Sequence, residues 1–289
     1  MSPATQVLNF IIHMRLHYQV LILSGGYLLA TLFVDFIDWG QYIRQFVNVH
    51  IFLFGGATVF NSFWDKDEGP IGGLKHPPKM KPWMRPVSMV MQFFALAWCL
   101  TISVEFTVIY GISLLLFWLY SSPKARWKGH PLLSLIAIGI STGTNSFLLG
   151  ILATGQPELR LEHIIASIGV ACIILSLYPI SQIYQMEEDS RRGDVTFTMK
   201  YGLGNAKRFF LVLFPAGVLI ISTMMYPISH EVAMPFFLCG IFAFVLISML
   251  MTRLIGSTSE YNLVMRMKFL ASFSFVMFIL SSLLIKSII

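Results

Sequence analysis

Residues 61–68 read NSFWDKDE, and residues 182–189 read QIYQMEED. Each of these acidic motifs closes a long apolar segment, and each is followed by a loop rich in lysine and arginine. Carboxylates are costly to place at a membrane boundary, so they mark a function by default. The two motifs together predict a divided metal site that holds a polyanion.

The composition places the chain in a lipid bilayer. Hydrophobic residues make up 56% of the 289 residues and charged residues only 12%, whereas soluble domains carry about 25% charged residues. A spanning helix needs roughly 20 apolar residues. The apolar runs predict nine spans, at residues 19–36, 46–64, 88–104, 106–120, 131–153, 164–184, 208–226, 233–250 and 268–287. The third and fourth spans divide near Glu105, with one long segment over residues 87–119 as the alternative.

The order of these spans predicts the architecture. Spans 1–4 and spans 5–8 each carry an acidic motif at the end of their second helix, which is a weak internal repeat. We therefore expect an all-α polytopic protein with two four-helix halves around a central cavity and a ninth helix left over. No hydrophilic stretch is long enough to bury a core of its own, so residues 1–289 are expected to form a single membrane-embedded domain.

Charge predicts the orientation. With nine spans and the N-terminus inside, 17 of the 20 lysines and arginines fall in inner loops, as the positive-inside rule describes. Both acidic motifs and the mouth of the cavity would then face the cytoplasm, and we expect a bacterial inner-membrane protein. The net charge of +6 is explained by this topology, so no nucleic-acid binding is expected.

Oxygen-bearing side chains recur at helical spacing in both motifs. They are Asn61, Asp65 and Glu68 at i, i+4 and i+7, and Gln182, Gln185 and Asp189 at i, i+3 and i+7. Such spacing places each set on one face of a helix. Carboxylate and amide oxygens suit Mg²⁺, which is commonly shared with substrate phosphates. The alternative is that the acids only form ion pairs with neighbouring lysines and arginines.

Basic residues follow the acidic motifs and the fourth span. Cations that converge on a metal site would neutralise a diphosphate leaving group in the transition state, and the candidates are Lys81, Arg85, Lys124, Arg126 and Arg192. The alternative is that these residues only obey the positive-inside rule.

Five sequence features in this order resemble the UbiA superfamily of intramembrane aromatic prenyltransferases. They are Asn61 with Asp65, Arg85-Pro86, the segment from Tyr120 to Arg126, the segment from Asp189 to Thr196, and Tyr201-Gly202. The resemblance covers nearly the whole chain. It implies nine helices around a cavity, Mg²⁺-dependent ionisation of a polyprenyl diphosphate, and prenyl transfer to a lipophilic, aromatic acceptor, as in quinone biosynthesis. Asp65, Asp189, Asn61 and Glu68 would then be metal ligands, with Tyr120 and Gln185 at the substrate.

Three positions depart from the motifs of that superfamily. Ser62 and Gly69 stand where the first motif has aspartates, and Gln185 replaces the first aspartate of the second motif. An intramembrane terpene cyclase, in which the cation reacts with its own double bonds, therefore remains an alternative. A transporter or a non-catalytic lipid-binding protein is a third hypothesis, although transporters place their sites near mid-membrane. The Gly- and Pro-rich segment 69–78 is interpreted as a shaped loop or lid, with a plain linker as the alternative.

Overall fold

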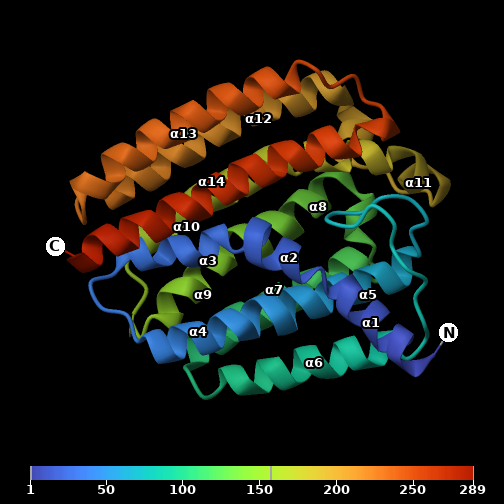
Figure 1. Cartoon of the computed structure of the whole chain (residues 1–289), viewed down its shortest axis with the longest axis horizontal. Coiled ribbons are helices and arrows are strands. Elements are labelled where there is room, and N and C mark those ends of the chain that lie inside the picture. The colour runs from blue at the N-terminus through green and yellow to red at the C-terminus, as the bar shows by residue number, and fades with distance from the viewer. Residues whose placement is uncertain (1, 157, 289) are drawn as a thin grey trace.

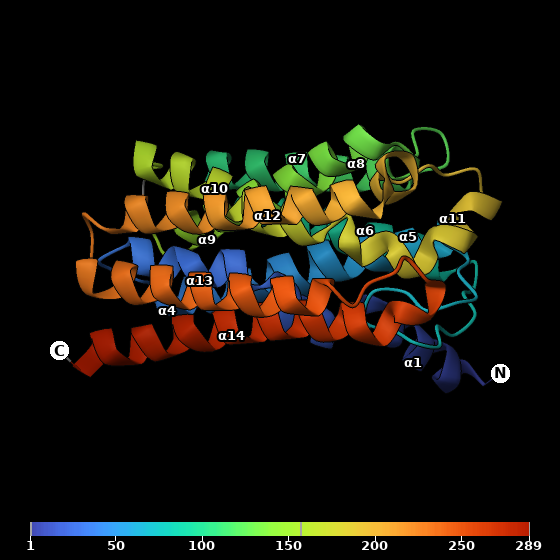
Figure 2. The same ribbon diagram turned by 90° about the horizontal axis from the view of Figure 1, so that it is seen from above.

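The computed structural model describes residues 2–156 and 158–288, and it shows a bundle of long helices (Figures 1 and 2). The first half of the chain contains α1 (Pro3–Met14), α2 (Leu16–Tyr18), α3 (Gly25–Leu29), α4 (Trp39–Val47), α5 (Gly56–Asp65), α6 (Met84–Cys99) and α7 (Val104–Ser121). The second half contains α8 (Pro131–Ile138), α9 (Asn145–Ala153), α10 (Leu161–Leu177), α11 (Met186–Arg191), α12 (Phe197–Met225), α13 (His230–Met251) and α14 (Tyr261–Ile288).

Several of these helices join into longer spans through wide or tight helical turns. π-Helical turns at Gln19–Leu23, Asn48–Gly55 and Gly139–Thr144 connect α2 to α3, α4 to α5, and α8 to α9. A 3-10 turn at Ile180–Gln185 connects α10 to α11. Turns of this kind bend a helix or change its register and are frequent at functional sites. They let the spans curve around a central space.

The predicted fold is confirmed. In the described part of the chain, eight helical segments are long and apolar enough to cross a membrane. The ninth is α6, whose 16 residues span about 24 Å at 1.5 Å per residue. The expected division near Glu105 is also present, because Ser103 accepts a hydrogen bond from the backbone N–H of Phe106 and begins α7.

Some predicted boundaries were wrong. Helical backbone begins before residue 19, because Ser2 caps α1 at Pro3, but the left-handed angles of Arg15 separate α1 from the helix that begins at Leu16. The seventh span begins at Phe197 rather than at 208, and non-helical backbone angles at Gly202 (φ +83°) kink it. Hydropathy marks only the bilayer-crossing part of a helix and does not show the helical segments on the polar side of these two breaks.

Apolar side chains cover much of the outside of the bundle. Phe242 is 71% exposed, Val90 is 67% exposed and Leu238 is 61% exposed, as expected where lipid is the solvent. Inside, small residues bring helices together: a Cβ on Gly217 of α12 would lie 2.6 Å from the carbonyl oxygen of Gly169 in α10. Close approach through small residues is the usual way in which membrane helices pack.

A cavity of about 330 Å³ lies inside the bundle. Side chains from both halves of the chain line it, from Asn61 and Phe117 in the first half to Asp189 and Phe214 in the second. Its far part is apolar and is bounded by Phe236 and Phe278. Polar groups line one end, where the chain segments that follow α5, α7 and α11 meet.

Candidate functional site

The two acidic motifs meet at one lysine. Lys128 lies in the loop between α7 and α8, and its Nζ is 2.6 Å from Oδ2 of Asp65 and 3.9 Å from Oδ1 of Asp189. All three residues are buried. Asp65 is the last residue of α5, where the helix dipole disfavours a negative charge. The ammonium group of Lys128 therefore compensates a negative charge that the helix end does not favour.

Arg126 joins the same loop to the segment after α11. Its Nε and one terminal nitrogen donate to the two carboxylate oxygens of Asp194 at 2.6 and 2.7 Å, and its other terminal nitrogen is 3.5 Å from Oδ1 of Asp65. The backbone N–H of Val195 also donates to the carbonyl oxygen of Gly129 at 3.0 Å. Two-pronged arginine–carboxylate pairing of this kind fixes geometry as well as charge.

Arg192 connects the two acidic motifs from the other side. Its guanidinium donates to Oδ1 of Asp67 at 2.7 Å, to Oδ1 of Asp189 at 2.8 Å and to the backbone carbonyl of Asp65 at 3.2 Å. Burial lowers the pKa of Arg192, but Asp67 and Asp189 raise it by more, so the net pKa lies above its ordinary value. The guanidinium is therefore a fixed positive charge.

The carboxyl group of Asp67 is held differently from its neighbours. Burial and the nearby Asp65 raise its pKa, and Lys128 and Arg192 only partly oppose this. For Arg126, burial again lowers the pKa, but Asp194 and Asp65 raise it above its ordinary value. The site thus combines permanent cations with the carboxyl group of Asp67, whose raised pKa means that it takes up a proton more readily than usual.

Arg15 reaches this end of the cavity from the break between α1 and α2. It adopts left-handed backbone angles (φ 52°), and its guanidinium donates to Oγ of Ser62 at 2.8 Å and to the carbonyl oxygen of Gly72 at 3.3 Å. Arg15 is 7% exposed. Ser62 is the position at which the resemblance leads one to expect an aspartate, and a guanidinium lies against it here.

Hydroxyl and amide groups line the cavity below the charged network. The hydroxyls of Tyr120 and Tyr178 are 2.9 Å apart, and Nε2 of Gln182 donates to the Tyr178 hydroxyl at 3.0 Å. Nδ2 of Asn61 donates to Oγ of Ser121 at 3.2 Å. These bonds fix the amide and phenol groups in the wall of the cavity.

The oxygen donors fit a magnesium ion shared with a substrate. Oδ1 of Asp65 and Oε1 of Gln182 are buried and accept no hydrogen bond in the described structure. Within that same part of the chain, no three His, Cys, Asp or Glu side chains converge as a metal cage. Mg²⁺ usually takes one or two carboxylates and completes its shell with waters and substrate phosphates, so such a cage is not required.

Most of the predicted site residues come together. The structure places Asn61, Asp65, Gln185, Asp189 and Tyr120 against the cavity or the ion-pair network beside it, with Arg126 and Arg192 in that network. Gln182, Gln185 and Asp189 all line the cavity, although Gln182 and Gln185 belong to a 3-10 turn and Asp189 to α11.

Glu68 does not share a face with Asp65, so that prediction was wrong. The helix ends at Asp65 because Lys66 takes left-handed backbone angles (φ 52°). Glu68 is therefore in the following loop, where its side chain is exposed. Its backbone N–H and that of Gly69 both donate to Oε1 of Glu188 at 2.9 Å, which joins this loop to α11.

Three predicted cations lie apart from the network. Arg85 packs over the rings of Phe63 and Trp64, 5.5 and 5.4 Å from their centroids. Lys124 is exposed, and neither it nor Lys81 is among the described side chains that line the cavity. Cation–π packing places the Arg85 guanidinium against an aromatic face, away from the carboxylates.

Four residues at the site were not among the predicted site residues. They are Arg15, Lys128, Asp194 and Lys268. Three of them are inner-loop cations that topology alone already explained. Asp194 directly follows Gly193, whose φ of +77° turns the chain back toward Arg126, and the DSRRGD run was the available signal.

Segment 69–78 is held as a shaped loop. Nε2 of His13 donates to the carbonyl oxygen of Pro78 at 2.8 Å, and Nε2 of His17 donates to that of Gly73 at 2.9 Å. Ile71 and Leu74 exchange backbone hydrogen bonds at 2.8 and 2.9 Å. These contacts favour the shaped loop over a plain linker, and its action as a lid stays a prediction.

Several solved structures share this fold. A UbiA homologue from Archaeoglobus fulgidus bound to DMAPP and Mg²⁺ matches with a TM-score of 0.69 and 12% identity, over 93% of this chain and 99% of that chain. The same homologue bound to GPP and Mg²⁺ matches with a TM-score of 0.67 and 13% identity, over 91% and 99%. A structure reported for digeranylgeranylglyceryl phosphate synthase in membranes matches with a TM-score of 0.64 and 19% identity, over 96% and 98%.

Identities this low establish the fold alone. No curated protein sequence matches the chain. The sequence pattern of the UbiA prenyltransferase family, however, matches residues 20–273, which is most of the chain. This protein is therefore a member of the UbiA prenyltransferase family.

Proposed function

We propose that the protein is a Mg²⁺-dependent intramembrane prenyltransferase that ionises a polyprenyl diphosphate and transfers the prenyl group to a lipophilic, aromatic acceptor. The observation that supports this most directly is the meeting of Asp65 and Asp189 beside the polar end of an apolar cavity. The Archaeoglobus homologue binds DMAPP or GPP with Mg²⁺ in the same fold, which supports a prenyl diphosphate donor here.

The charged end of the cavity would bind the diphosphate. Asp65 and Asp189 would hold Mg²⁺, with Asn61 and Gln182 contributing amide oxygens from the cavity wall. The bound metal would neutralise charge on the diphosphate as it leaves. Lys128 and Arg126 lie close enough to Asp65 to share that task, because fixed cations stabilise charge that develops in the transition state.

The apolar part of the cavity would hold the prenyl chain. When the bond between the first prenyl carbon and the diphosphate oxygen breaks, the electron pair leaves with the diphosphate and an allylic cation remains. Phe117, Tyr120 and Tyr178 line the cavity beside the charged end, and aromatic faces attract cations. Apolar walls also exclude water, which limits hydrolysis of the cation.

We also infer the membrane orientation from charge. The N-terminal end of the chain and the charged network lie at the same end of the bundle (Figure 1), and most lysines and arginines fall in loops of the predicted inner side. The positive-inside rule then places the mouth of the site in the cytoplasm, and a bacterial inner membrane is our proposal for its location. The role in quinone biosynthesis likewise stays a proposal.

Diphosphate release by the purified protein in detergent tests the donor reaction. C10, C15 and C20 prenyl diphosphates would be supplied with Mg²⁺, each with and without a lipid extract. Asp65→Asn and Asp189→Asn should abolish release, whereas Glu187→Gln should not, because the Glu187 side chain is 62% exposed and pairs with Arg191. Thermal unfolding of each variant would show that it is folded. Near-normal turnover in both aspartate variants would contradict the mechanism.

The same assay separates the transferase from the terpene cyclase. A transferase releases diphosphate only when the extract supplies an acceptor, and the labelled product then identifies that acceptor. A cyclase releases diphosphate without extract and forms a cyclic hydrocarbon. Ser62 and Gln185, which replace aspartates of the superfamily motifs, are the feature that keeps the cyclase as the second candidate.

A further inference from the structure

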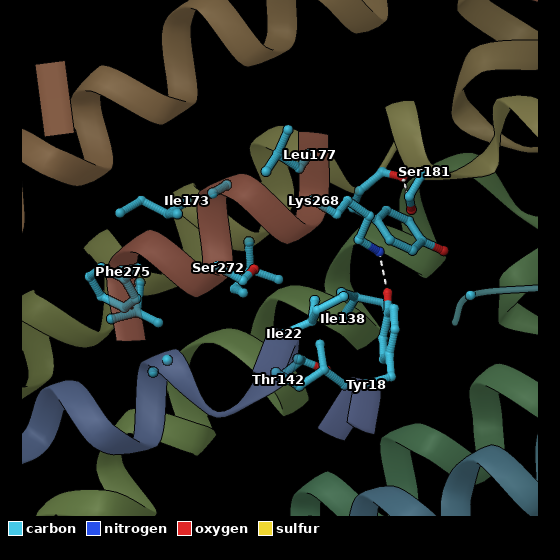
Figure 3. Close-up of a pocket in the computed structure, with 18 of the residues that line it drawn as sticks. Tyr18, Ile22, Ile138, Thr142, Ile173, Leu177, Ser181, Lys268, Ser272 and Phe275 are labelled. Atoms are coloured by element: carbon cyan, nitrogen blue, oxygen red, sulfur yellow. Dashed lines mark hydrogen bonds between the residues drawn. The ribbon is translucent and has the colours of Figure 1, made fainter. Parts of the chain in front are cut away.

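A second cationic group faces the cavity from the opposite helix. Lys268 lies seven residues into α14, about 10 Å from the start of that helix at 1.5 Å per residue. Its Nζ donates to the hydroxyl of Tyr18 and lies 4.9 Å from the centroid of the Tyr18 ring. Figure 3 shows the hydrogen bond that joins the two side chains in the wall of the cavity, with Ser272 farther along α14. A lysine that only followed the positive-inside rule would extend toward the aqueous loop instead.

Lys268 and Arg15 differ from the other cations of the site. Arg126, Lys128 and Arg192 each lie within 4.0 Å of at least two carboxylates. Among the described residues, no carboxylate lies that close to Lys268 or Arg15. Arg15 is buried and Lys268 is partly buried, and a charge held out of water without a counter-ion is costly. The cavity therefore carries two cationic groups whose charge is not balanced by direct ion pairs.

Tyr18 connects these two groups. The backbone N–H of Tyr18 donates to the carbonyl oxygen of Arg15 at 2.8 Å, so the two residues are one turn apart. The Tyr18 ring also packs against the 69–78 loop, where a Cβ on Gly73 would lie 2.9 Å from it. Arg15 itself donates to the carbonyl oxygen of Gly72. The position of the phenol is thus fixed by the loop, and the Lys268 ammonium is held against it.

The surroundings of Lys268 change from polar to apolar along the cavity. Ser272 lies one turn beyond Lys268 on α14, and Phe275 and Phe278 follow further along the same helix. Cys239 and Phe236 of α13 line the cavity at that depth. A ligand that places an anionic head group at Lys268 would therefore have its tail among aromatic and aliphatic side chains.

We propose that Lys268, Tyr18 and Arg15 form a subsite for the anionic head group of the acceptor, which would be an amphiphile that carries a carboxylate or a phosphate. This inference rests on the proposed function, because it divides the cavity between two substrates. The diphosphate of the donor belongs to the Asp65–Lys128–Asp189 network. The acceptor anion belongs to the side formed by α2 and α14. The shared chemistry is anion binding, and the experiment must separate its two sources.

Binding in a neutral maltoside detergent tests the assignment without turnover. The probes are dodecyl phosphate, dodecanoate, uncharged dodecanol, and geranyl diphosphate with Mg²⁺, each followed by titration calorimetry. Lys268→Met should weaken dodecyl phosphate binding at least tenfold and leave dodecanol and geranyl diphosphate within about twofold of wild type. Lys268→Arg should restore most of the affinity for dodecyl phosphate. Arg266→Met is the matched control, since Arg266 is an exposed cation on the same helix, and it should bind every probe as wild type does.

Two results would overturn the assignment. An equal loss of geranyl diphosphate binding in Lys268→Met would place Lys268 in the donor site. Unchanged binding of every probe would show that Lys268 binds no anion and contributes only to membrane topology. If Lys268→Met does not fold, Lys268→Gln removes the charge but keeps a hydrogen-bond donor for Tyr18, and the same losses are expected. Failure of the proposed function would look different: wild-type protein would bind dodecyl phosphate but release no diphosphate from any donor.

Discussion

Lys128 is the residue whose removal tests the charged network most directly. Its Nζ lies 2.6 Å from Asp65 and 3.9 Å from both Asp189 and Asp194, and its side chain is 9% exposed. At an effective dielectric constant near 20, the contact with Asp65 is worth about 6 kcal/mol and each of the longer ones about 4 kcal/mol. Desolvation of the ammonium offsets much of this sum.

The net effect of Lys128→Met is therefore expected to be smaller than the Coulomb terms. Breaking a buried ion pair by removing one partner costs about 3–5 kcal/mol, because the remaining charges stay buried without compensation. At roughly 2–4 °C per kcal/mol, the midpoint of thermal unfolding should fall by roughly 10 °C. Tryptophan fluorescence of the protein in detergent, recorded while the sample is heated, measures this shift.

A double-mutant cycle separates the ion pair from the packing of the lysine side chain. Asp65→Asn removes the closest carboxylate, so adding it to Lys128→Met should cost little further stability, with a coupling energy of about 2–3 kcal/mol between the two substitutions. Lys124→Met is the matched control, since Lys124 is an exposed lysine of the same loop. Its unfolding midpoint should lie within about 1–2 °C of the wild-type midpoint, because substitutions at exposed surface positions change stability little. A Lys128→Met midpoint equal to that of the control would refute the reasoning that the lysine holds the two acidic motifs together.

Two further outcomes follow from the structure. Burial raises the pKa of the Asp67 carboxyl group above its ordinary value of 3.8, so ionisation of this group opposes folding. The contribution of Asp67 to wild-type stability should therefore rise as the pH falls through the raised pKa toward 3.8. The Asp67→Asn variant should flatten this part of the stability–pH profile. An unchanged profile in that variant would contradict the assignment. A Cβ on Gly143 would lie 2.5 Å from Cα of Ala171 in α10, so Gly143→Ala should lower the midpoint of thermal unfolding by several degrees. Gly204→Ala is the control, because its Cβ meets nothing within 4 Å, and it should leave the midpoint unchanged or raise it slightly. Equal midpoints for the two variants would show that the close packing at Gly143 does not contribute to stability.

The number and order of the helices were predictable because they depend on the lengths of apolar runs. The bilayer requires about 20 apolar residues for a span, and this requirement does not depend on tertiary contacts. The break between α6 and α7 was visible for a local reason, since Ser103 precedes Glu105 at the start of a helix. The starts of the first and seventh helices were not visible, because capping by Ser2 and the helical segments on the polar side of the breaks at Arg15 and Gly202 carry no hydropathy signal.

The site was only partly predictable, and Lys124 and Lys128 show why. Both lysines lie in the same loop, four residues apart, but one is exposed and the other is buried against Asp65. The 3-10 turn at Trp127–Gly129 and the close approach of Gly129 to Asp194 decide which lysine turns inward. Such tertiary contacts do not appear in residue spacing. Glu68 was misplaced for a similar reason, since a single left-handed residue ended the helix before it.

The balance of charge at the site explains why a donor and a metal would bind together. Four buried or nearly buried carboxylates, those of Asp65, Asp67, Asp189 and Asp194, form ion pairs with the three cations Arg126, Lys128 and Arg192. This set is close to neutral, so a diphosphate alone would bring about three uncompensated negative charges into a low-dielectric space. A divalent metal alone would bring two positive charges. Their charges largely cancel when both are present, and Lys268, on the far wall of the cavity, stays available for a different anion. The same electrostatics that favour joint binding of donor and metal therefore leave Lys268 and Arg15, which form no direct ion pair with this network, for the second substrate.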